Sequence, residues 1–308
     1  MYCRAIKNDS PAAGATRIII APGSIQHPTE KFEGRQVILM QVYGADFSGA
    51  RNPSRGIYYA EGKLNKRTLH LERVVHCDDR LDLLMAIHFS KAPWGLDFPF
   101  SIPAEAFSQL KLGNWSELLT LAAESERAEF DDYLENSGIP GCEVRCRDCS
   151  TCCRAADAAV QAFSPFKKTK PTMRMMTYAG LKLLSYLHQL GHRVYPFDQI
   201  DLKASRLYEV YPSHCWRQVG LKGNKNLALF ADRFHERYGL KVTAEDSLFA
   251  LESPDAVDAA VACICLGYVL ASCELEADWG RRQAWMSEAE WVNRHLEGLI
   301  VKVSSNYK

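Results

Sequence analysis

The sequence has no uninterrupted run of eighteen apolar residues, and no apolar stretch of the secretion-signal kind follows its first residues. Membrane-spanning helices and signal peptides require such runs. The expectation is therefore a cytoplasmic protein with no membrane partner. A net charge is also absent, because 37 Lys and Arg balance 37 Asp and Glu. A nucleic-acid partner would then have to meet a local basic surface rather than the field of the whole chain.

The motifs of two large enzyme classes are missing. The sequence contains neither the G-x-S-x-G nucleophile elbow nor the G-x-x-x-x-G-K-[ST] phosphate-binding loop. His214 and Cys215 are adjacent. Neighbours on one element point apart, so these two do not predict a nucleophile and its base. Hydrolases with that elbow and P-loop enzymes are excluded.

The composition divides the chain into three parts. Residues 1–35 mix Ser, Pro, Gly and charged residues, which predicts a loosely ordered extension. Residues 36–273 alternate β-prone and helical segments, which predicts an α/β domain. Within it, residues from about 104 to 192 are expected to form a helical, cysteine-rich insertion. Residues 274–308 are expected to form a C-terminal helical extension.

The apolar pattern predicts a mixed sheet with helices on both faces. Residues 37–45 are continuously apolar and β-prone, as in a strand buried on both sides. Two strands with a turn at Asn65-Lys66 follow as a hairpin, and Asp78-Asp79 offers an N-cap to a helix whose apolar positions are Leu81, Leu84, Met85 and Phe89. The expected strands are residues 37–45, 56–64, 68–76, 92–98 and 205–211. The expected helices after the hairpin begin near Asp79 and cover 115–135, 172–190, 226–238 and 254–272.

Three acidic residues fall at the carboxyl ends of the buried strands, where ligands collect in parallel sheets. They are Asp46, Asp97 and Glu209, each embedded among apolar residues. A carboxylate in such surroundings is costly unless a partner or a metal neutralises it. We therefore expect one acidic cluster.

A fourth component comes from the start of a helix. Ser253 is a good N-cap and Pro254 a good first residue, and Asp255 and Asp258 then share one face of the first turn. For Asp255, a favourable interaction with the helix dipole is as good an explanation as metal ligation. Asp258 is less easily explained in that way, because it lies in a helix expected to be buried. Together the acids are predicted to bind magnesium or manganese.

Four phrases in order resemble one known family. They are Gly-Ala-Asp-Phe-Ser-Gly-Ala from Gly44, Gly-Leu-Asp-Phe-Pro from Gly95, Tyr-Glu-Val-Tyr-Pro-Ser from Tyr208 and Asp-Ala-Val-Asp-Ala-Ala from Asp255. The chain from residue 37 to 272 is similar to the domain-of-unknown-function family numbered 429 (DUF429), which is regarded as predicted nucleases with an RNase H-like fold. The resemblance implies a two-metal hydrolysis of phosphodiester bonds in DNA or RNA. It implies the metal ligands and catalytic residues Asp46, Asp97, Glu209 and Asp258.

Basic and hydroxyl groups are expected near such a centre to contact phosphate. The best local cluster is Lys167, Lys168, Lys170 and Arg174, in a segment similar to the family's Ser-Pro-Phe-Lys turn. Ser48, two residues after Asp46, is a further candidate for substrate contact. A solvated charged loop explains the basic cluster equally well.

A cysteine-rich loop is the remaining signal. Its first four thiols are close enough to bind zinc or an iron–sulfur cluster, but a short loop without a distant second pair is unusual for structural zinc. Plain reduced thiols are as well supported, and we expect most cysteines of the chain to be reduced. The candidate ligands are Cys142, Cys146, Cys149 and Cys152.

Two other functions remain open at this point. The Asp-Phe-Ser-Gly sequence after the first strand is also compatible with a nucleotide phosphohydrolase or phosphotransferase of the actin and sugar-kinase type. Those enzymes have two related domains, and only one copy of the strand pattern is present. A binding module with structural acids is the second alternative.

Overall fold

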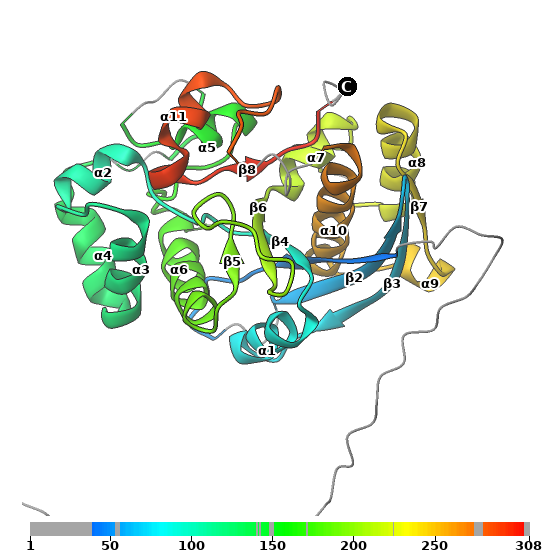
Figure 1. Ribbon diagram of the computed structural model, residues 1–308, viewed down its shortest axis with the longest axis horizontal. Coiled ribbons are helices and arrows are strands. Elements are labelled where there is room, and N and C mark those ends of the chain that lie inside the picture. The colour runs from blue at the N-terminus through cyan, green and yellow to red at the C-terminus, as the bar shows by residue number, and fades with distance from the viewer. Residues whose placement is uncertain are drawn as a thin grey trace, which may run out of the picture. The chain divides into compact units, whose positions relative to one another are not determined.

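A computed structural model describes residues 39–52, 56–139, 141, 143–147, 151–170, 172–223, 225–273 and 280–304 (Figure 1). Residues 38–308 belong to one compact unit. The extension expected at residues 1–35 lies outside the described residues.

The centre of this unit is a mixed sheet, as predicted. Among the described residues its strands follow the order β5-β6-β4-β1-β2-β3-β7, and β8 pairs with β6. The first three strands are antiparallel neighbours, while β4 and β6 run parallel to β1. The strands are β1 (Met40–Asp46), β2 (Tyr58–Asn65), β3 (Thr68–His76), β4 (Pro93–Asp97), β5 (Arg193–Val194), β6 (Arg206–Val210), β7 (Lys241–Thr243) and β8 (Ile300–Val301).

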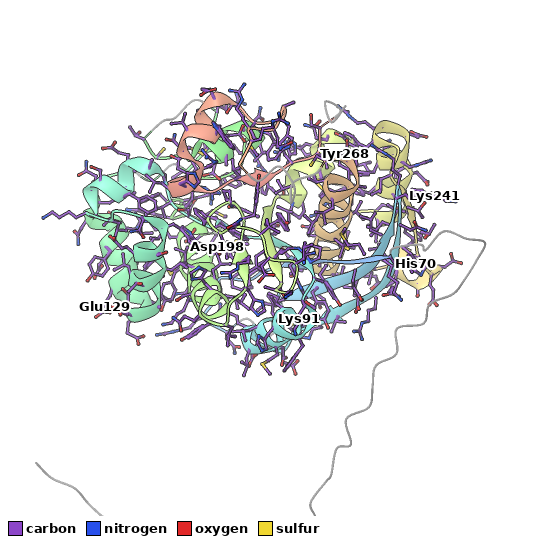
Figure 2. The ribbon with its side chains drawn as sticks, in the orientation of Figure 1. His70, Lys91, Glu129, Asp198, Lys241 and Tyr268 are labelled. Carbon is purple, nitrogen blue, oxygen red and sulfur yellow. A yellow bond between two sulfur atoms is a disulfide. The ribbon has the colours of Figure 1, made fainter. Side chains whose placement is uncertain are left out.

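Three details of the sheet differ from expectation or go beyond it. The hairpin turn is Lys66-Arg67, one residue later than predicted, with Lys66 in the left-handed region at φ 51°. At one edge β7 presents Lys241 to solvent beside β3 with its His70 (Figure 2), which discourages pairing with another chain. From the segment expected to be a helical extension, β8 joins the sheet beside β6.

The helices lie on both sides of the sheet, with α10 on one side and α6 on the other (Figure 1). The predicted helices at residues 172–190, 226–238 and 254–272 are confirmed within a residue. The helices are α1 (Arg80–Ser90), α2 (Ala104–Gln109), α3 (Trp115–Glu124), α4 (Arg127–Asn136), α5 (Ala155–Val160), α6 (Met173–Gln189), α7 (Pro212–Gln218), α8 (Leu227–Tyr238), α9 (Asp246–Phe249), α10 (Pro254–Ser272) and α11 (Glu288–Glu297).

Two helix predictions are wrong in detail. The helix expected at 115–135 is two helices, because Glu126 leaves the helical conformation and closes a capping box with Glu129 at the start of α4. In α1, Leu81 and Phe89 are 60% and 69% exposed, and Leu83 and Ile87 are buried instead. Asp79 caps α1 as predicted. The apolar pattern of α1 allows either face inward, and packing in the core shared with α6 selects Leu83 and Ile87.

The close seating of α10 positions the acidic residues. A Cβ atom on Gly44 would lie 2.0 Å from the backbone nitrogen of Cys263 and 2.6 Å from the carbonyl oxygen of Ala259. Only glycine therefore lets the helix backbone rest on β1. The Cys263 thiol donates to the carbonyl of Val42, 3.3 Å away. The helix runs antiparallel to β1, so its first turn reaches the end of that strand.

Among the described helices, α10 alone is long and apolar enough by length and composition to cross a membrane. Of its most apolar window, 72% is buried within the fold. That degree of burial is the usual property of a core helix, and it accounts for the apolar composition.

Candidate metal centre

Two aspartates end neighbouring strands in register. Asp46 is the last residue of β1, Asp97 the last residue of β4, and the two are direct partners in the parallel ladder. Strands in a sheet lie about 4.8 Å apart. Each residue is half-buried. The structure therefore brings this predicted pair together, and it does so through backbone pairing that leaves little freedom.

The first turn of α10 adds two more aspartates, as predicted. Asp255 and Asp258 are both half-buried, and Ser253 caps the helix by accepting from the Ala256 N–H. A Cβ atom on Gly56 would lie 3.6 Å from Oδ2 of Asp255 and 3.2 Å from Cβ of Ser48. The Asp255 carboxylate is therefore next to the loop that follows β1.

Burial and mutual repulsion act on these acids together. The pKa of Asp46 is raised well above its ordinary value, first by burial and then by the charges of Asp97, Asp258 and Asp255. The pKa of Asp97 is also raised well above its ordinary value, by burial and then by Asp258 and Glu209. A raised pKa means that the ionised form lacks compensation. The centre thus has an unmet demand for positive charge.

Asp258 has two partners within the chain, which the sequence did not reveal. Its Oδ1 accepts from the Trp216 indole N–H at 2.8 Å, and both of its oxygens contact the ammonium of Lys225. The same lysine lies 5.4 Å from the centroid of the Trp216 ring. Nothing in the sequence around Lys225 distinguishes it from an ordinary loop lysine, so this residue could be found only from the fold.

Asp46 and Asp97 have no such partner. In the part of the chain that the structure describes, no hydrogen bond or ion pair uses either carboxylate. Carboxylate oxygens are the ligands that Mg²⁺ and Mn²⁺ prefer. The donor chemistry of this pair therefore fits a hard divalent cation.

Glu209 lies beside Asp97 but is engaged elsewhere. Its Oε1 and Oε2 accept from the two terminal nitrogens of Arg154 at 2.5 and 2.8 Å, and Oε2 also accepts from the Phe100 N–H at 3.0 Å. Glu209 is 3% exposed and Arg154 is fully buried. Burial raises the pKa of Glu209, and the charge of Arg154 opposes that effect. Metal ligation by Glu209 stays a prediction, and both of its oxygens already accept from Arg154.

The guanidinium of Arg154 is itself fully used. Besides Glu209 it donates to both oxygens of Asp157, at 2.9 and 2.6 Å, and to the carbonyl oxygen of Glu297 at 3.2 Å. Its five N–H groups therefore all have acceptors. Arg154 joins α5, β6 and the end of α11, and no motif around it in the sequence indicates this role.

Three of the basic residues expected to contact substrate already have partners within the chain. Lys167 is buried and donates to the Thr169 carbonyl at 2.6 Å. Arg174 is buried and pairs with Asp131 and Glu135, and Lys168 also pairs with Glu135. Lys167 and Arg174 are therefore buried within the fold, whereas Lys168 is exposed and paired with an exposed carboxylate. Their contact with a substrate stays a prediction.

Ser48 lies in the loop after β1, which is held by hydrogen bonds from Arg80. Its hydroxyl accepts from the Ala50 N–H at 3.2 Å, and Arg80 donates to the carbonyl oxygens of Ser48 and Ala50 at 2.9 and 2.5 Å. A Cβ atom on Gly49 would lie 2.4 Å from the backbone nitrogen of Met176. The loop after β1 is thus held against the start of α6, which fixes Ser48 near the acids.

The cysteine loop is described in part. Cys146 and Cys153 form a disulfide, and Cys152 is buried. A second pair, Cys215 and Cys265, is joined between α7 and α10. These pairings were not predicted, and in this state Cys146 has no thiolate to offer a metal. Cys142 and Cys149 lie outside the described residues, so the zinc or iron–sulfur site stays a prediction.

The acids do not form a complete coordination shell by themselves. Within the described ranges, no three His, Cys, Asp or Glu side chains converge on a point that could hold a metal ion.

Comparisons of the chain with family models, curated proteins and solved structures give no match.

Proposed function

We propose that this chain is a divalent-metal-dependent nuclease that hydrolyses phosphodiester bonds of DNA or RNA on an RNase H-like fold. The observation that carries the proposal is the pair of Asp46 and Asp97, which lie side by side with raised pKa values and no partner in the described part of the chain. Magnesium or manganese is the cation proposed to satisfy them.

The strand arrangement supports the fold assignment. The order β3-β2-β1-β4-β6, with three antiparallel strands followed by parallel ones, is the arrangement expected of an RNase H-like sheet. The four sequence phrases that resemble the DUF429 family all lie at the strand ends or at the start of α10. Neither the strand order nor the four phrases depend on the electrostatics of the acids.

The chain's own residues would act by holding and orienting. A divalent ion bound here would polarise a phosphoryl oxygen and lower the pKa of an attacking water. Asp46 and Asp97 would hold that ion on the rigid ends of two strands. Asp258, fixed by Trp216 and Lys225, would border that ion from the side of α10. The basic groups are expected to orient the nucleic-acid backbone.

A binding module without catalysis is the second candidate. The observation in its favour is that Lys225 and Arg154 already neutralise Asp258 and Glu209 without any metal. In such a protein the remaining pair would serve recognition or stability alone.

Cleavage assays decide between these functions. The full chain is incubated with Mg²⁺ or Mn²⁺ and single- or double-stranded DNA and RNA, beside Asp46→Asn and Asp97→Asn. We expect product from the wild type and a loss of about 100-fold or more in each variant, since each removes a proposed ligand. Equal traces from wild type and variants would refute catalysis by these acids. ATP turnover measured alongside tests the phosphohydrolase alternative.

A further inference from the structure

Lys225 is placed to act on the whole acidic cluster. Its ammonium contacts both oxygens of Asp258, and its charge lowers the pKa of Asp46, Asp97 and Asp255 against the trend set by burial. The charge of Lys225 thus acts on three of the four aspartates from a distance, and its ammonium contacts the fourth. Lys225 therefore contributes to the electrostatic potential at all four.

The position of Lys225 is set by its surroundings. The Trp216 ring lies beneath its side chain, and the next residue, Asn226, caps α8 by accepting from the Leu229 N–H at 2.8 Å. A helix start on one side and an indole on the other restrict where the ammonium can go. The side chain is 34% exposed, so a phosphate arriving from solvent can reach it.

The available ligands also count against two metal ions. In this arrangement Asp258 is taken by Lys225 and Glu209 by Arg154. Two metal ions about 4 Å apart require carboxylates that reach both of them. Among the described residues of the cluster, the Asp46 and Asp97 pair and the flanking Asp255 are the acids without a cationic partner, which suits one ion. A lysine ammonium supplies one positive charge and three N–H donors without a coordination shell.

We propose that Lys225 serves as the second cation of the centre, so that one divalent ion binds at Asp46 and Asp97 and the lysine takes the place of the other. This proposal rests on the proposed function. Lys225 then contacts a non-bridging oxygen of the substrate phosphate with an N–H group not used by Asp258, and it holds Asp258 in position. It replaces the two-ion scheme implied by family resemblance with one ion and one lysine.

Metal stoichiometry tests the proposal without relying on activity. Mn²⁺ is titrated into the full-length wild type, Lys225→Met, Lys225→Arg and Lys222→Met by isothermal titration calorimetry. Lys222 is exposed in the same loop, so its substitution is the matched control. Circular dichroism and thermal midpoints establish that each variant is folded. Lys225→Arg keeps the positive charge.

We expect one Mn²⁺ per chain in the wild type, Lys222→Met and Lys225→Arg. Lys225→Met removes a competing charge, so it should bind a second ion or bind one ion with a Kd lower by about tenfold. Two ions in the wild type, or a Kd of Lys225→Met within about threefold of Lys222→Met with unchanged stoichiometry, would overturn the inference. Two ions with intact cleavage would leave the proposed function standing, whereas no Mn²⁺ binding by any form would contradict the function itself.

Discussion

Two groups of carboxylates lie near the carboxyl ends of the central strands, and they are compensated in opposite ways. Glu209 and Asp157 are buried and fully paired through one guanidinium, that of Arg154. Asp46 and Asp97 are adjacent, less buried and without any hydrogen-bond donor in the described part of the chain. In the first group each carboxylate has a cationic partner. The second is incomplete, which is the property expected of a site that binds a cation from solvent.

The largest effect should come from breaking the paired group. Arg154→Met leaves Glu209 and Asp157 as buried charges without a countercharge, and removal of one member of such a network costs about 3–5 kcal/mol. Urea unfolding measures the loss. Arg147→Met is the matched control, because Arg147 is exposed in the same loop. Adding Glu209→Gln to Arg154→Met should recover part of the loss. Equal stability of the two single variants would contradict the assignment of Arg154 as the structural cation.

Substitution in the unpaired group, Asp46 and Asp97, should raise the stability of the protein rather than lower it. Asp97→Asn removes a charge that burial and the neighbouring Asp258 disfavour, so the metal-free protein should become more stable. Chemical unfolding in the presence of a chelator measures the change. A loss of stability as large as that of Arg154→Met would show that Asp97 has a structural partner after all.

The pH dependence follows from the same difference. The pKa of Asp97 is raised from an ordinary value of 3.8, so the folded protein binds this proton more tightly than the unfolded chain. Its contribution to stability is fully present below pH 3.8 and is lost as pH rises through the raised pKa. The thermal midpoint of the metal-free wild type should therefore fall relative to Asp97→Asn across that rise. Parallel pH profiles would contradict the assigned repulsion.

The smallest effect is expected at the basic segment before α6. Lys168 is exposed and paired with the exposed Glu135. If it contacts the nucleic-acid backbone, Lys168→Met reduces the salt dependence of binding by about one unit of slope and leaves the fold unchanged. Fluorescence anisotropy with labelled DNA and RNA at several salt concentrations measures the slope, and Lys91→Met, at an exposed position away from this segment, is the control. An unchanged slope removes Lys168 from the binding surface.

Much of this arrangement could be predicted from the sequence, for physical reasons. Asp46 and Asp97 were predictable because continuous apolar runs identify buried strands and the acids stand at their ends. Ser253 and Pro254 likewise predict the start of a helix. Gly44 permits that helix to pack closely on β1. Mixed sheet topology follows from the hairpin and from the spacing of the later strands.

The compensating cations were not predictable, because they meet their acids only in three dimensions. Arg154 contacts Glu209 from 55 positions away, and Lys225 contacts Asp258 from 33 positions away. Neither stands in a motif. The inward face of α1 was wrongly predicted for a similar reason, since packing rather than local pattern selects Leu83 and Ile87.

The contrast between the two acid groups is tested most directly by calorimetric titration of Mn²⁺ into wild type, Asp46→Asn and Glu209→Gln. We expect the wild type to bind Mn²⁺, a folded Glu209→Gln to bind it with a similar Kd, and Asp46→Asn to show no binding. Undiminished binding by Asp46→Asn, or loss of binding in a folded Glu209→Gln, would refute a cation site at Asp46 and Asp97.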